Sequence, residues 1–188
     1  MKIYFLGIMK KILLIISLLI LSLPGFSQSY LGWVKKQAKF REGPGVDYNS
    51  IGSLKQGKQI FIISSESEND FYNIIDIATD KEGYIHKSFV KFGQKVKLNE
   101  NDVFQSIGRS STFKPEVEIF NNTSLTLSLK LNVDKYSFSP FEKKTISLSS
   151  ENYNFRASAP GVIPLLGAKY FESNMKYSWE FYVLTKRR

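Results

Sequence analysis

The stretch Ala38-Lys39-Phe40-Arg41-Glu42-Gly43-Pro44-Gly45-Val46-Asp47-Tyr48 joins a strand-like beginning to a tight chain reversal. Gly43 can adopt a positive φ without steric cost and Pro44 fixes the next φ, so the pair predicts a compact loop. Arg41 carries a planar fork of donors that could bind loop carbonyls or pair with Asp47. We therefore predict a strand that ends in a loop displaying Tyr48.

Short strands separated by turn residues surround this loop. Alternating apolar residues and turn signals predict strands at 32–40, 51–54, 59–64, 71–77 and 83–86. Gly57 suits the turn between two of these strands, and Gly83 would let the last strand pass close to its neighbour. Residues 28–93 are therefore expected to form one small β domain.

Four motifs of this half resemble those of the bacterial SH3-like family. They are the run from Ala38 to Tyr48, Ile51-Gly52-Ser53-Leu54-Lys55-Gln56-Gly57, Phe71-Tyr72-Asn73-Ile74, and Gly83-Tyr84-Ile85-His86-Lys87-Ser88-Phe89-Val90. The resemblance covers about residues 32–90. It implies a small barrel of about five or six strands that commonly binds cell-wall peptides or other proteins. Two departures are an aromatic other than Trp at 71–72 and an acidic insertion at 65–70.

The candidate binding surface implied by this resemblance consists of Tyr48, Tyr72 and Tyr84, with Asp47 and His86 at its edge. Tyrosine rings offer apolar contact area together with a hydroxyl group, which suits recognition in a shallow groove. The alternative is that two of the three rings pack inside the barrel.

The second half also has the sequence of a β domain. Leu125, Leu127 and Leu129 alternate with polar residues, as do Tyr177, Trp179 and Phe181, so each set predicts a half-buried strand. We expect residues 113–188 to form an antiparallel β-sandwich, and residues 94–112 to form a linker with a short strand near 103–107. Residues 151–161 loosely resemble extracellular transthyretin-like or PEGA-like modules, from which no functional residue is inferred.

Residues 1–27 have the layout of a cleaved signal peptide. Met9-Lys10-Lys11 precedes an apolar run at 12–23, and small residues precede a cleavage site before Gln28. A retained signal anchor is the alternative, and translation from Met9 instead of Met1 stays open. We expect an exported protein, periplasmic or extracellular, with no stable membrane span after signal removal.

The amino-acid composition excludes several kinds of catalytic site. The chain has no Cys and one His, which excludes disulfides, a thiol nucleophile and any site with two imidazoles. His86 could act as the base of a serine triad, but the sequence has no Gly-x-Ser-x-Gly motif to hold the nucleophile. Most Asp and Glu residues lie in turns, which argues against a pair of catalytic carboxylates in a cleft. We therefore expect no enzyme activity, no cofactor and no metal site.

The formal net charge is +9, or +6 once Lys2, Lys10 and Lys11 are removed with the signal peptide. This excess favours anionic partners, and an ordinary solubilising surface is the alternative. Export and the scatter of the basic residues argue against nucleic acid. We predict a non-catalytic binding protein of the bacterial envelope that recognises a peptidoglycan peptide or an envelope protein. One alternative is an adaptor that assembles through its sandwich. Another is an accessory subunit of a wall hydrolase without activity of its own.

Overall fold

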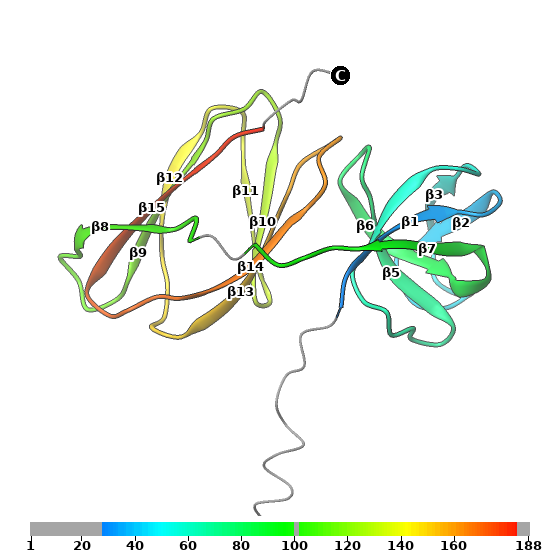
Figure 1. The fold of residues 1–188 in the computed structure, drawn as a ribbon, viewed down its shortest axis with the longest axis horizontal. Coiled ribbons are helices and arrows are strands. Elements are labelled where there is room, and N and C mark those ends of the chain that lie inside the picture. Colours follow the sequence, from blue (N-terminus) through cyan, green and yellow to red (C-terminus); the bar gives the residue numbers. More distant parts are fainter. Residues whose placement is uncertain (1–27, 100–101, 184–188) are drawn as a thin grey trace, which may run out of the picture.

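The computed structural model describes residues 28–99 and 102–183, and within these ranges the chain is all-β apart from one short 3-10 helix (Figure 1). The all-β fold class predicted from the sequence is therefore confirmed. The predicted signal peptide at 1–27 lies outside the described residues. None of the described helices is long and apolar enough to cross a membrane.

The first half is one curled seven-stranded sheet with the order β3-β2-β6-β5-β4-β1-β7, in which every neighbouring pair is antiparallel. Its elements are β1 (Tyr30–Val34), β2 (Ala38–Arg41), β3 (Ser50–Leu54), β4 (Gln59–Ile62), β5 (Phe71–Asp76), β6 (Lys81–His86), η1 (Lys87–Phe89) and β7 (Val90–Lys95). The segment 32–40, expected as one strand, is two strands separated by a bend at 35–37.

Alternate residues of these strands form the barrel core, as the period-two pattern requires. The fully or almost fully buried side chains include Val34, Phe40, Ile60, Ile74 and Ile85. Gly57 has a φ of +77°, as expected for its turn. A Cβ on Gly83 would lie 2.6 Å from the carbonyl oxygen of Arg41, so the predicted close approach of neighbouring strands is confirmed.

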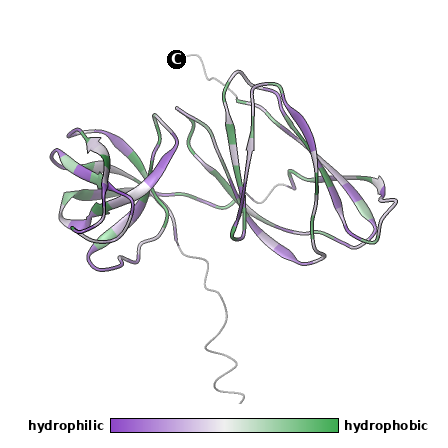
Figure 2. Ribbon diagram, turned by 180° about the vertical axis from the view of Figure 1, so that it is seen from behind, coloured by the Kyte–Doolittle hydropathy of each residue, from purple (hydrophilic) through white to green (hydrophobic). Residues whose placement is uncertain are grey.

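The second half is a sandwich of two four-stranded sheets, β11-β10-β13-β14 and β12-β9-β15-β8. Its strands are β8 (Gln105–Arg109), β9 (Glu116–Asn121), β10 (Leu127–Leu131), β11 (Asp134–Phe138), β12 (Lys143–Ser147), β13 (Asn152–Ser158), β14 (Leu165–Tyr170) and β15 (Met175–Phe181). Hydrophobic and hydrophilic positions alternate along the strands in Figure 2. β9 and β15 are parallel, whereas the other pairs of the sandwich are antiparallel.

Part of the range 94–112, predicted as a linker, belongs to the two domains themselves. β7 continues to Lys95, and β8 pairs with β15 at the edge of the second sheet. Phe104 is completely buried in the sandwich core, where its ring meets those of Phe155 and Trp179. The described connection between the domains is therefore shorter than the sequence indicates.

The two domains make direct contact. Leu166 of β14 packs against a cluster formed by Phe61, Ile75 and Ile77 of the first domain. The Gly161 amide donates a hydrogen bond to the Ile77 carbonyl oxygen at 2.7 Å. Apolar and backbone contacts together hold one face of the sandwich against the barrel.

Candidate functional site

The loop after β2 is built around the ring of Tyr48. Gly43 does not have a positive φ, so the role predicted for it is wrong. A Cβ at Gly43 would lie 2.2 Å from Cδ1 of Tyr48, which means that this glycine lets the ring lie against the backbone. Arg41 Nη1 donates a hydrogen bond to the Tyr48 carbonyl oxygen at 2.7 Å. Of the two partners predicted for Arg41, a loop carbonyl and Asp47, the structure thus shows the loop carbonyl.

The three predicted tyrosines do not share one surface. Tyr72 lies opposite Ile85 on the inner face of β5, packs against the barrel core, and meets Phe92 edge-on with 5.1 Å between ring centroids. Tyr84 points outward, because it alternates with the buried residues of β6, and it pairs with Asn73. Tyr48 is 50% exposed.

The environment of Tyr84 on the outer side of the barrel favours its neutral form. Burial raises the pKa of the Tyr84 hydroxyl, and the nearby groups Glu68, Glu82 and Tyr48 raise it further. Neutral phenol is therefore the stable form of Tyr84 over the whole physiological pH range. It can donate one hydrogen bond without introducing charge.

A groove of about 470 Å³ lies beside this loop. It is formed by the residues before and within β2, the β2–β3 loop, the beginning of β5, the end of β6 and η1. Its lining residues are Gln37, Ala38, Lys39, Arg41, Val46, Phe71, His86, Ser88 and Phe89. The volume falls within the range of about 300–1,000 Å³ that is typical of ligand sites.

His86 has a defined position in this groove. Its Nδ1 accepts a hydrogen bond from the backbone N–H of Ser88 at 3.3 Å and thereby caps η1. The ring stands edge-on to Phe71, with 5.2 Å between centroids. Because Nδ1 is an acceptor, the neutral imidazole carries its proton on Nε2, which is then a hydrogen-bond donor.

Cations dominate the electrostatics of the groove. Lys39 and Arg41 line it, and the Lys36 ammonium lies 5.2 Å from the centroid of the Phe89 ring. None of the described residues that line the groove carries a carboxylate. The neighbouring Asp70 is paired with Lys87 at 2.8 Å, and the hydrogen bond and charge of Lys87 lower the pKa of its carboxyl group.

Among the residues predicted for the site, only His86 lines this groove. Asp47 and Tyr48 are exposed in the adjoining loop, Tyr84 lies on the outer side of β6, and Tyr72 faces the core. Phe71, Phe89 and Lys39 were missed as groove residues, because apolar residues in strand alternation resemble core residues and a single lysine resembles a solvated one. No group of His, Asp and Glu suitable for a metal ion occurs in the described part of the chain.

Comparison with known proteins identifies the first domain. Residues 36–91 match the bacterial SH3 domain family, so the chain contains a bacterial SH3 domain, as the sequence motifs predict. No curated protein matches the chain. None of these matches supports the loose resemblance of residues 151–161 to transthyretin-like or PEGA-like modules.

One solved structure is similar at low level, that of NlpC1 from Trichomonas vaginalis. The TM-score is 0.31 and the sequence identity 13%, over 82% of this chain and 48% of the other. The chain thus spans about half the length of that protein. A likeness of this size carries no argument about function.

Proposed function

We propose that this protein is a non-catalytic binding protein of the bacterial envelope whose SH3 domain holds an anionic peptide segment, such as a peptidoglycan stem peptide, in the groove beside β2. The observation that carries the proposal is the combination of an aromatic floor with unopposed cations. Phe71 and Phe89 supply apolar contact area, while Lys39 and Arg41 attract carboxylates. The predicted export through residues 1–27 would bring the domain to the wall.

Recognition would combine fixed donors with one movable charge. Arg41 is held in place by its bond to the Tyr48 carbonyl oxygen, and His86 is held by Ser88. Groups positioned before binding lose little entropy when a ligand arrives. Lys39 is exposed and makes no ion pair within the described residues, so its ammonium group is available to a ligand carboxylate.

Co-sedimentation of the purified protein with peptidoglycan tests the proposal. We expect Lys39→Gln to weaken binding several-fold, while Lys55→Gln, which removes the same charge from an exposed position outside the groove, leaves it unchanged. A soluble stem peptide should compete with the wall for the protein. Thermal unfolding of both variants shows whether they are folded.

Three results would contradict the proposal. Equal losses in both lysine variants would indicate general charge attraction, which also disappears at moderate salt. Absence of sedimentation at low salt would favour the adaptor hypothesis. Release of soluble muropeptides during long incubation would show that the protein is an enzyme.

A further inference from the structure

The sandwich face that meets the SH3 domain carries three cations in one cross-strand row. Lys135 of β11 lies opposite Lys130 of β10, Lys130 lies opposite Arg156 of β13, and Arg156 lies opposite Leu166 of β14. Directly opposite residues of neighbouring strands share a face, and like charges in such positions destabilise a sheet. Negative charge from outside the sheet would relieve the repulsion along this row.

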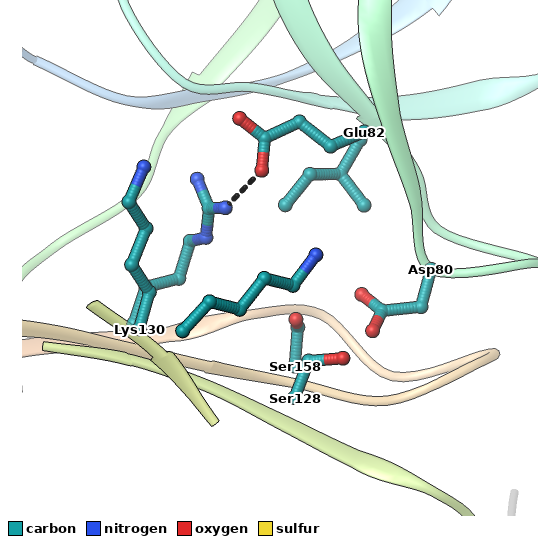
Figure 3. A pocket seen from close by; sticks show the side chains of 8 residues that line it. Asp80, Glu82, Ser128, Lys130 and Ser158 are labelled. Atoms are coloured by element: carbon teal, nitrogen blue, oxygen red, sulfur yellow. Dashed lines mark hydrogen bonds and ion pairs between the residues drawn. The ribbon is translucent and has the colours of Figure 1, made fainter. Parts of the chain in front are cut away.

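The SH3 domain supplies only part of that charge. Glu82 Oε2 lies 2.5 Å from Arg156 Nη2, and Asp80 faces the same space (Figure 3). In Figure 3 the side chain of Lys130 runs up toward the SH3 domain beside this ion pair. Lys130 and Lys135 make no ion pair with any described residue, so three cations meet two carboxylates at the junction.

A cleft of about 360 Å³ opens next to the row. Lys130 and Arg156 contribute to its wall, together with the amide side chains of Asn132 and Asn154. The remaining wall is mostly apolar and comes from both domains, through Phe61, Ile63, Leu98, Phe155 and Leu166. Clefts between domains with an apolar lining and a few polar groups are preferred sites for small ligands.

We propose that this junction cleft binds a small amphipathic carboxylate, independently of the peptide groove of the SH3 domain. The carboxylate completes the neutralisation of the row by pairing with Lys130. Its hydrocarbon chain lies along Leu98 and Leu166, where apolar surface is removed from water. Because both domains form the cleft, the bound molecule also stabilises their contact.

Titration with octanoate, followed by calorimetry and by the backbone amide shifts of Lys130 and Leu166, tests this site. We expect saturable binding that Lys130→Met weakens at least tenfold, because methionine keeps the chain and removes the charge. Lys144→Met, on the exposed edge strand β12, should bind octanoate normally. Leu98→Ser, at a position that is 43% exposed, should also weaken binding without unfolding the protein.

Neutral and purely ionic probes complete the test. Octanamide, which has the hydrocarbon chain without the charge, should bind much more weakly than octanoate. Sulfate should change the backbone amide shift of Lys130, and its affinity should be the same for the parent protein and Leu98→Ser. The proposal is overturned if octanoate does not bind saturably, if Lys130→Met binds it like the parent protein, or if octanamide binds equally well. Sulfate and octanoate of equal affinity would also overturn it, because the apolar wall would then have no role.

Discussion

Replacing Glu82 by Gln would measure how strongly the ion pair at the junction holds the two domains together. The Arg156 side chain is 11% exposed and that of Glu82 is 27% exposed, so both groups have lost much of their hydration. Glu82 Oε1 also accepts a hydrogen bond from Asn73 Nδ2 at 3.1 Å. Glutamine keeps the shape of the side chain and removes its charge, so Arg156 loses the carboxylate with which it forms its ion pair.

The expected loss in the free energy of unfolding is about 2 kcal/mol, since hydrogen bonds to charged groups contribute about 1.5–3 kcal/mol and this pair is only partly buried. For a chain of this size that loss lowers the Tm by about 4–8 °C. Glu118→Gln is the matched control. Glu118 pairs with Lys143 at 2.8 Å, but the two side chains are 35% and 58% exposed, so the control should cost less than about 1 kcal/mol.

The effect should depend on pH. Burial by itself would raise the pKa of Glu82, but Arg156, the Asn73 amide and Lys130 outweigh it and lower this pKa from its ordinary value of 4.5. A depressed pKa in the folded state stabilises the protein above the unfolded value, and this stabilisation is lost as pH falls through the folded pKa. The Tm difference between the parent protein and Glu82→Gln should therefore shrink below about pH 4.5.

Scanning calorimetry at several pH values provides the measurement. The reasoning would be refuted if Glu82→Gln and Glu118→Gln lowered the Tm by the same amount at neutral pH. It would also be refuted if the difference for Glu82→Gln stayed constant from neutral to acidic pH, because that would assign the loss to packing.

Two further substitutions test the fold. Gly83→Ala should destabilise the SH3 domain by about 1–3 kcal/mol, because the new Cβ would lie 2.6 Å from the Arg41 carbonyl oxygen; an unchanged urea midpoint would contradict this close approach. Phe104→Ala should cost about 3–5 kcal/mol in urea unfolding, because its ring is completely buried in the sandwich, whereas Phe113→Ala, at a position that is 80% exposed, should be nearly neutral. Equal small effects of the two would place Phe104 outside the core.

The positions of most strands and turns could be predicted because their signals are local. Alternating residues such as Tyr177, Trp179 and Phe181 indicate which side chains share a face, and the buried face is confirmed for these three. Gly57 illustrates the same point for turns, since its positive φ follows from the residue type at that position. The bacterial SH3 domain could also be identified from the spacing of its motifs.

The groove was harder to predict, because it depends on which surfaces of distant strands come together. Phe71 and His86 lie on one face of the β5–β6 pair and meet η1 and β2 only after the sheet curls. Tyr72 follows Phe71 directly in β5, and successive side chains of a strand point to opposite faces, so Tyr72 faces the core. Aromatic residue type alone does not distinguish these two positions.

Local chemistry therefore determined that this chain is built from short strands, that its first half is an SH3 domain, and that it lacks thiols and paired imidazoles. Tertiary contacts alone decided that β9 and β15 run parallel, that Phe104 joins the sandwich core, and that Lys135, Lys130 and Arg156 form one row facing Glu82. The physical reason is that alternation and turn preference act between neighbours in the chain. The pairing of strands and the formation of ion pairs such as that between Glu82 and Arg156 depend on contacts between residues that are far apart in the sequence. No local pattern encodes such contacts.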